Sequence, residues 1–323
     1  MNKKALGVGL MLLALVALTS LVQPSFLEPV NLQNLARWIG LYGILSVGMA
    51  FVLLTGGVDL SVGSIVGLSG CVLFLWIQAG VSEVLAVAGV LALGTLLGVV
   101  HGLLITGLRL QPFVVTLCGL FFYRGFARYL ADDEALGLPR EEHPGLFRLV
   151  ESSPWTLGMP GPFVILVVTA VLAAVLLNLT VPGRWLRALG DNEQAARYSG
   201  IPTGRMTVLA YALSGLSAGL AGILFALHVS TVQPSVHGNF YELYAIAGAV
   251  LGGCSLRGGE ASILGVVFGA ALVRVLYNAI NLLRIPTQLE YAVIGGIILA
   301  GVIADELLRR QALRRSLRHG PGG

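Results

Sequence analysis

The sequence has little charge and almost no lysine. Only 11% of its 323 residues are Asp, Glu, Lys or Arg, whereas a soluble domain carries about a quarter. With 56% hydrophobic residues and a mean hydropathy of +0.86, the chain lacks the polar surface that a water-soluble protein needs. Its length allows about ten helices of roughly 20 residues with short connections. We expect an all-α polytopic membrane protein without a soluble catalytic domain.

The scarcity of lysine excludes one energy source. Lysine occurs only at Lys3 and Lys4, while a phosphate-binding GxxxxGK[ST] loop needs a lysine inside the chain. The protein therefore has no ATP site of that kind. Its net charge of +4 does not indicate a nucleic-acid partner, because the basic residues lie between apolar runs rather than on one solvated face.

Cysteine and histidine are too few and too scattered for a disulfide framework or a metal site. Each of the three cysteines lies in an apolar stretch, where a small side chain simply packs. The five histidines show no HExxH spacing, and no Cys-x-x-Cys occurs. We expect no disulfide, metal or cofactor. A membrane-embedded enzyme would need clustered His, Asp and Glu residues, which this pattern does not offer.

Ten apolar stretches predict the membrane spans, since every backbone polar group in lipid must be satisfied within its own helix. They cover 5–22, 38–79 as two spans, 84–107, 112–131, 162–181, 206–229, 241–256, 261–283 and 287–304. The first follows Lys3 and Lys4 as a signal peptide would, but its Ala17-Leu18-Thr19-Ser20 is a poor cleavage site, so we expect an uncleaved helix. The short stretch 241–256 indicates a half-helix or a bent segment.

The basic residues favour one orientation. With both termini in the cytoplasm, thirteen of the twenty basic residues fall on the cytoplasmic side, as the positive-inside rule requires. A single transmembrane domain, 1–323, then has an acidic extracytoplasmic loop at 132–161, a cytoplasmic loop at 182–205 and a basic cytoplasmic tail at 305–323. Arg274 falls within a span, where we expect an acid or a lipid headgroup as its partner.

Glycine spacing predicts close helix packing. Small residues at every fourth position let helix backbones approach each other, and the sequence has such sets at Gly94/Gly98/Gly102, Gly215/Gly219, Gly248/Gly252 and Gly265/Gly269. We interpret them as packing positions rather than ligand sites. The motif GG-x-x-L-x-x-G occurs at 56–63 and again at 252–259, and either an internal repeat or chance would produce this similarity.

The segment TGGVDLSVGS, residues 55–64, interrupts the second apolar run. Asp59 and Ser61 stand where a helix amino cap would accept backbone N–H bonds. A carboxylate at membrane depth costs about 2.5–3.5 kcal/mol on insertion scales, so it needs a role or a partner. Two interpretations stay open. The segment is a broken helix that lines a translocation pathway with Asp59, Ser61 and Ser64, or a structural cap at a cytoplasmic turn.

The cytoplasmic segment GRWLRALGDNEQAARYSGIP, residues 183–202, predicts a docking element. Asp191 or Asn192 can cap a short helix, which Gly200 and the following proline would end. Small alanines on an exposed short helix suit a groove on another protein, and a merely solvated loop has no need of them. We expect contact with another protein at Arg184, Arg187, Gly190, Asp191, Asn192, Ala195, Ala196 and Gly200.

Polar residues in the later spans are further pathway candidates. Asn278 and Asn281 lie three apart on one helical face, and Gln288 and Glu290 open the last span. Hydrogen bonding between helices is the alternative.

Three stretches of the sequence carry a family resemblance. They are GMAFVLLTGGVDLSVGS (48–64), ALGDNEQAARYSGI (188–201) and YELYAIAGAVLGGCSLRGG (241–259). In this order they resemble the permease subunits of bacterial monosaccharide ABC importers of the ribose, xylose and arabinose type. The resemblance covers roughly residues 35–305. The chain departs from the family at Tyr244, usually an acid or amide, at Cys254, usually threonine, and near Ala261, usually glycine.

The resemblance implies one half of an importer in the bacterial inner membrane. Two permeases, identical or paralogous, would form the pathway, and an extracytoplasmic binding protein would deliver the sugar. ATPase subunits would supply the energy and would contact the docking element within residues 183–202. The chain would be no enzyme, and Tyr244 would lie on the pathway. An ABC permease for a nucleoside or a branched-chain amino acid is the alternative. An ion-coupled secondary transporter would need paired intramembrane acids, for which Asp59 alone is thin support.

Overall fold

The computed structural model describes residues 3–152, 156 and 158–284 and the isolated positions 286, 289, 292, 295, 296, 299 and 303. The predicted span 287–304 lies mostly outside these residues, and Gln288, Glu290 and the tail 305–323 lie wholly outside them.

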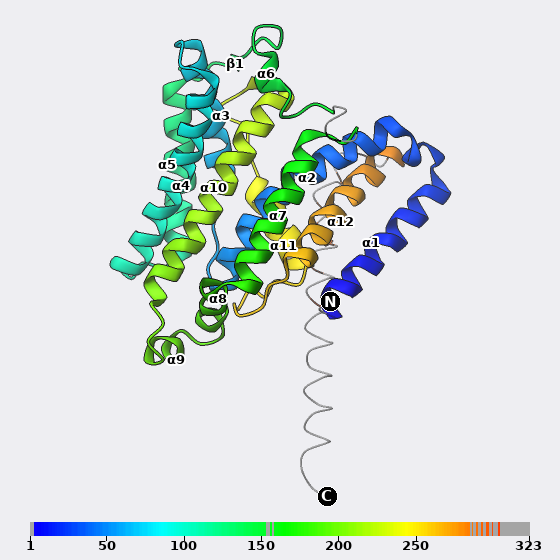
Figure 1. Cartoon of the computed structure of the whole chain (residues 1–323). Helices are drawn as coiled ribbons and strands as arrows, with labels where there is room; N and C mark the ends of the chain where they lie inside the picture. The colour runs from blue at the N-terminus through cyan, green and yellow to red at the C-terminus, as the bar shows by residue number, and fades with distance from the viewer. Residues whose placement is uncertain are drawn as a thin grey trace, which may run out of the picture.

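The described chain is a bundle of helices, shown in Figure 1. Seven helices are long and apolar enough to cross a membrane: α1 (Lys3–Val22), α2 (Pro29–Leu54), α4 (Glu83–Gly107), α5 (Pro112–Leu130), α7 (Gly161–Leu179), α10 (Thr203–Val229) and α12 (Ile263–Leu282). The shorter elements are η1 (Pro24–Leu27), α3 (Val62–Gln78), α6 (Pro144–Phe147), α8 (Val181–Asp191), α9 (Glu193–Tyr198), α11 (Tyr241–Leu251) and the strands β1 (Leu136–Gly137) and β2 (Thr231–Val232). The expected all-α polytopic fold is confirmed.

Three boundaries differ from those expected. Helix α2 begins nine residues before position 38, because its polar first turns hide an amphipathic pattern in which Leu35 is buried. Helix α11 ends at Leu251, since Gly253 takes a positive φ of 91°. The segment 182–205 contains α8 as well as the one short helix that the sequence predicts.

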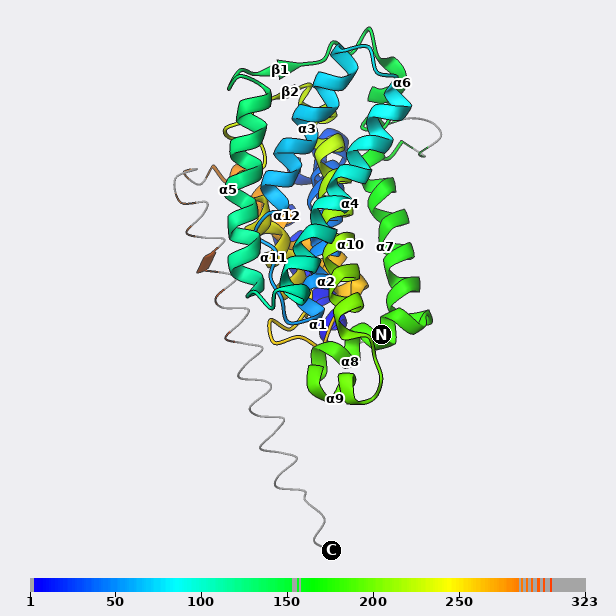
Figure 2. The same ribbon diagram turned by 90° about the vertical axis from the view of Figure 1, so that its left-hand side faces the viewer.

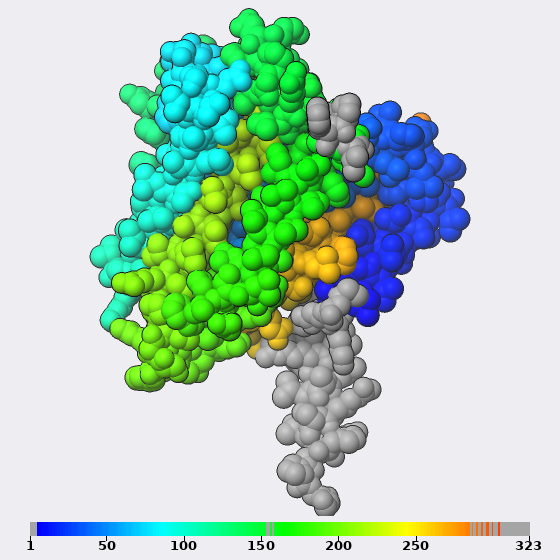
Figure 3. Space-filling view, in the orientation of Figure 1, coloured from blue at the N-terminus to red at the C-terminus, as the bar shows by residue number. Residues whose placement is uncertain are grey.

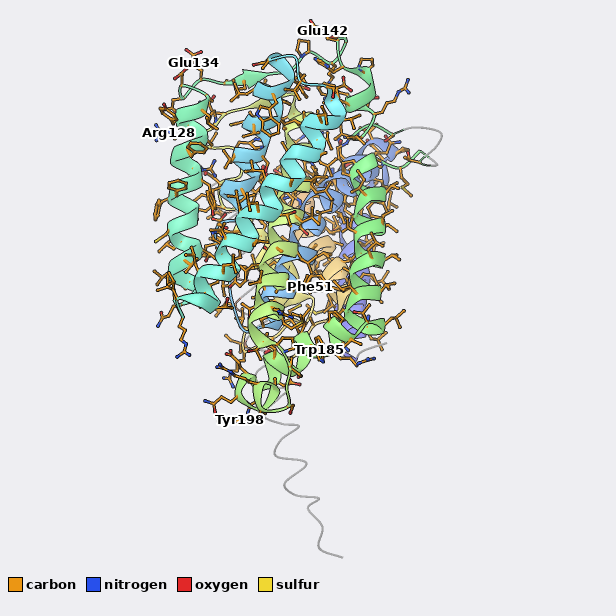
Figure 4. The ribbon with its side chains drawn as sticks, turned by 60° about the vertical axis from the view of Figure 1, so that its left-hand side comes forward. Phe51, Arg128, Glu134, Glu142, Trp185 and Tyr198 are labelled. Atoms are coloured by element: carbon orange, nitrogen blue, oxygen red, sulfur yellow. The ribbon has the colours of Figure 1, made fainter. Side chains whose placement is uncertain are left out.

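The two ends of the bundle differ in charge and in structure. Helices α8 and α9 lie at the same end as the amino terminus, whereas β1 and α6 lie at the opposite end (Figure 1). Glu134 and Glu142 mark that opposite end in Figure 4. The segments assigned to the two sides of the membrane from their charge are therefore separated in space.

Helix α2 forms the centre of the core. Every residue from Gly40 to Leu54 is buried, and α7, α10, α11 and α12 pack around this helix. Outer helices such as α7, which crosses the surface between α10 and α12 in Figure 3, expose Val and Leu side chains. An apolar exterior around a packed interior is what lipid requires.

Two glycine seams join pairs of helices backbone to backbone. Helices α4 and α10 lie side by side (Figure 2), and Gly94 faces Gly215 across their contact. In the second seam, between α11 and α12, Gly252 faces Gly265. A Cβ at any of these positions would overlap backbone atoms of the partner helix. The packing role predicted for the glycine sets is confirmed.

The acidic segment 132–161 is folded onto the bundle. β1 pairs antiparallel with β2, so that Leu136 is opposite Val232, and the α6 region buries Phe147 and Val150 in the core. The segment therefore covers the end of the bundle opposite α8 and α9.

Candidate functional site

The docking element predicted from the sequence is a pair of capped helices. The Thr180 hydroxyl accepts the Gly183 N–H at the start of α8 (3.3 Å). Asn192, rather than Asp191, caps α9, because its Oδ1 accepts the Ala195 N–H at 2.9 Å. Gly200, with φ of 80°, ends the element. Capping fixes the shape of a segment that would otherwise be a flexible loop.

The exposed surface of this element differs from the predicted alanine face. Ala195 is exposed, but Ala196 is buried against the protein. The most prominent side chain is Tyr198, which is 91% exposed at the tip of α9 (Figure 4). An aromatic ring held outward on a short helix is typical of an interface anchor. The sequence placed Tyr198 in the helix but gave no sign of its exposure.

The other predicted coupling residues take different positions. Arg184 is exposed on α8, and the Arg187 guanidinium donates to Oδ1 of the Asn178 side chain at 2.5 Å. Gly190 is half-buried and packs against the protein, where a Cβ would overlap the Leu54 carbonyl and the Gly259 nitrogen. Gly190 therefore joins α8 to the rest of the protein.

Three segments at the end assigned to the cytoplasm from its charge meet at Gly190. The Gly259 N–H donates to the Leu54 carbonyl at 3.0 Å, and a Cβ at Gly258 would contact both Gly190 and Gly56. The two copies of the GG-x-x-L-x-x-G motif thus lie against each other and against the end of α8. We call these residues, 54–57, 190–191 and 257–259, the cytoplasmic junction.

An open cavity of about 890 Å³ lies beside the junction. It is bounded by Gly56 and Gly57, by the last turn of α4, by α9, and by the first turns of α5 and α10. Its charged lining comes from Arg109, Glu193, Arg197 and Arg205. The cavity opens at the same end as α9, so movement of α9 would change its shape.

Asp59 is fully buried and satisfied by hydrogen bonds. Its Oδ1 accepts the Ser61 N–H at 3.0 Å and the Ser61 hydroxyl at 2.6 Å, and its Oδ2 accepts the Ser214 hydroxyl at 2.8 Å. The His101 ring extends the cluster, with Nδ1 3.5 Å from the Ser61 hydroxyl and Nε2 2.8 Å from that of Tyr123. These hydrogen bonds offset the free-energy cost of removing the carboxylate from water.

The break between α2 and α3 enters the interior of the protein. Ser214 is eleven residues after Thr203, so Asp59 meets α10 about 16 Å along its axis. Neither Asp59 nor Ser61 caps α3 with its side chain, which corrects the capping expectation. Residues 55–61, which we call the re-entrant segment, are therefore the non-helical break between α2 and α3. Asp59, Ser61 and Ser64 are all buried in this conformation.

The other three pathway candidates lie in a second cluster. The Tyr244 ring is 5.2 Å from that of Tyr42, and the Arg274 guanidinium lies 4.6 Å over the Tyr42 ring. Asn278, one turn beyond Arg274, exchanges amide hydrogen bonds with Asn31 at 2.7 and 3.1 Å. Asn281 lines the same pocket as Asn278, so the predicted common face is confirmed.

Arg274 does not have the expected acidic partner among the described residues. Its guanidinium instead lies over the rings of Trp38, Tyr42 and Tyr277, at 5.1, 4.6 and 4.3 Å from the ring centroids. These distances are within the range of cation–π attraction. The sequence offered no signal for this arrangement, because the three rings come from two helices far apart in the chain.

Comparison with known proteins places the chain in a family. The model of the family described as branched-chain amino acid transport system / permease component matches residues 31–302. The ribose import permease protein RbsC of Bacillus subtilis is 40% identical over 301 residues, 93% of this chain and 92% of the relative. RbsC of Escherichia coli K12 is 37% identical over 294 residues, 91% of each protein.

A third relative has a different sugar in its name. The L-arabinose ABC transporter permease protein AraH of Azospirillum brasilense is 37% identical over 312 residues, 97% of this chain and 90% of the relative. No solved structure matches the chain. The chain belongs to the family described as branched-chain amino acid transport system / permease component, and it is a multi-pass transport protein of the cell inner membrane.

Proposed function

We propose that the chain is the membrane-spanning permease subunit of an ATP-binding-cassette importer for a monosaccharide of the ribose or arabinose kind. The observation that carries this proposal is the similarity to ribose import permeases over more than nine-tenths of both chains. The capped α8–α9 element supports it, because it offers a rigid cytoplasmic contact for a subunit that hydrolyses ATP.

The partners follow from this assignment. An ATPase subunit docks on α8 and α9, with Tyr198 and Ala195 as the projecting contacts. A second permease, either a copy of this chain or a paralogue, completes the pathway, and an extracytoplasmic binding protein delivers the sugar at the end that carries β1 and α6. Lipid covers the exposed apolar side chains of the outer helices.

The cytoplasmic junction is the proposed route of mechanical coupling. When the ATPase subunits close, they pull on α9 and α8, and Gly190 transmits the displacement to Leu54 and Gly259. Leu54 is the last residue of α2 and leads directly into the re-entrant segment. Movement of that segment would expose Asp59, Ser61 and Ser64 to the permeant.

Uptake by the reconstituted importer tests the assignment. The permease is placed in proteoliposomes with the ATPase subunit and binding protein of its own genome, and uptake of D-ribose, L-arabinose, leucine and a nucleoside is measured with and without internal ATP. ATP-dependent uptake of a pentose supports the proposal. Uptake of leucine or the nucleoside alone would assign the chain to the alternative that the family's description allows.

A further inference from the structure

A small polar pocket at the end of the bundle opposite α8 and α9 has the features of a binding site. Its volume is about 270 Å³, and it lies between the first turns of α2 and the last turns of α12. Its polar lining is Asn31, Asn34, Arg274, Asn278 and Asn281, with Trp38 and Tyr277 as its aromatic walls.

Helix periodicity explains why these residues face one another. On α2, Asn31, Asn34 and Trp38 follow at intervals of three and four, and on α12, Arg274, Asn278 and Asn281 do the same. Residues at such intervals share one face of a helix. The bonded pair of Asn31 and Asn278 fixes the two faces in register.

Arg274 carries an unused hydrogen-bond donor in this pocket. Its side chain is only 5% exposed, and its buried Nε has no hydrogen-bond partner among the described residues. A buried donor without an acceptor is costly, and native structures seldom leave one without a reason. A ligand oxygen in the pocket would supply the missing acceptor.

The surroundings of Arg274 favour a neutral ligand over an anion. The faces of three aromatic rings already compensate the positive charge of the guanidinium. The remaining polar groups of the pocket are amides, which donate and accept without charge. A planar guanidinium and several amides suit a ligand with adjacent hydroxyl groups. Pockets for drug-sized ligands begin at roughly 300 Å³, so the volume of about 270 Å³ suits a smaller ligand.

We propose that this pocket is a monosaccharide subsite at the extracytoplasmic entrance of the permease, in which Arg274 and Asn281 donate hydrogen bonds to sugar hydroxyls. This inference rests on the proposed import of a monosaccharide. The subsite receives the sugar as the binding protein releases it, before the re-entrant segment opens.

A fluorescence measurement on the full-length permease tests the subsite directly. Replacing Trp76, Trp155 and Trp185 by Phe leaves Trp38 as the sole tryptophan, and this residue lies beside Arg274. We expect D-ribose or L-arabinose to change its emission in a saturable manner. Asn281→Ala, at an exposed position, and Arg274→Lys should each raise the half-saturating concentration about three- to tenfold, as the loss of one hydrogen bond predicts.

Transport by the complete importer separates this inference from the proposed function. In proteoliposomes, Asn281→Ala should lower uptake at low sugar concentration and leave the maximal rate within about twofold. Leu172→Ala, at an exposed apolar position of the outer helix α7, should change neither. If the wild-type complex imports a pentose but Trp38 emission does not respond to it, the subsite is wrong and the importer assignment stands. A response to inorganic phosphate but not to sugar would also overturn the subsite. If no monosaccharide is imported, both proposals fall.

Discussion

Asp59 and Ser214, 155 positions apart in the chain, are joined by a hydrogen bond of 2.8 Å in the interior of the protein. This bond ties the re-entrant segment to α10, and with the two bonds from Ser61 it satisfies a carboxylate that has no access to water.

Removing either end of this contact should destabilise the protein. Ser214→Ala takes one donor from a buried carboxylate, which costs about 1–3 kcal/mol. Asp59→Ala should cost more, because it leaves two serine hydroxyls without their acceptor. The midpoint of thermal unfolding in detergent measures both. In the double variant, the two effects should be less than additive, and strict additivity would contradict the contact.

Side chains introduced into the α4–α10 seam should prevent normal packing. Gly98→Leu would place atoms against the Tyr211 backbone, and overpacking of this kind typically costs about 1–3 kcal/mol. Gly125→Ala on α5 is the matched control, since nothing lies within 4 Å of its Cβ position. Fluorescence-detected size exclusion after heating should show early aggregation of Gly98→Leu only. Equal stability of the two variants would rule out the seam as a close contact.

Loss of the Tyr198 ring should uncouple transport from ATP hydrolysis without affecting folding. Tyr198 is 91% exposed, so Tyr198→Ala removes no internal packing. The ratio of sugar imported to ATP hydrolysed in proteoliposomes should fall several-fold. Tyr129→Ala provides the control, because Tyr129 is 76% exposed at the other end of the bundle, on α5. An unchanged ratio in Tyr198→Ala would remove Tyr198 from the docking surface.

Arg124 should hold the segment before α11 in place. Its guanidinium donates to the carbonyls of Pro234 and His237, the first at 2.9 Å. Arg124→Gln removes the guanidinium nitrogen, Nη1, that bonds both carbonyls, so we expect faster amide hydrogen exchange in residues 233–240. Arg128→Gln, one turn further along α5, should leave the exchange unchanged, since Arg128 pairs with Asp133 instead. Identical exchange in both variants would contradict the prediction.

Local features of the fold could be predicted from the sequence because their causes are local. Glycine and proline positions separate α2 from α3 and end α9, and Asn192 caps α9 as one of two residues proposed for that role. The glycine sets could be assigned to packing because their spacing alone places them on one helix face. The sequence did not show which set meets which, since this depends on the arrangement of helices.

Partners distant in sequence explain what sequence reasoning missed. The sequence showed that Asp59 needs a hydrogen-bond donor. It did not show which one, because Ser214 is one of several hydroxyl-bearing residues in the apolar spans. Arg274 was expected to need an acid, because the cation–π partners on α2 cannot be assigned without knowing that α2 packs against α12. Exposure of Tyr198 and burial of Ala196 depend on how α9 lies against the protein, which a capping signal does not specify.

The seam between α4 and α10 limits how this permease can change shape. Where Gly94 meets Gly215, the two backbones touch, and no side chains lie between them that could adopt other rotamers. Sliding one helix past the other would drive backbone atoms into each other, so we expect the two helices to move as one unit. We expect the same of α11 and α12. We infer that alternating access moves these two helix pairs relative to α2, with the re-entrant segment adjusting between them.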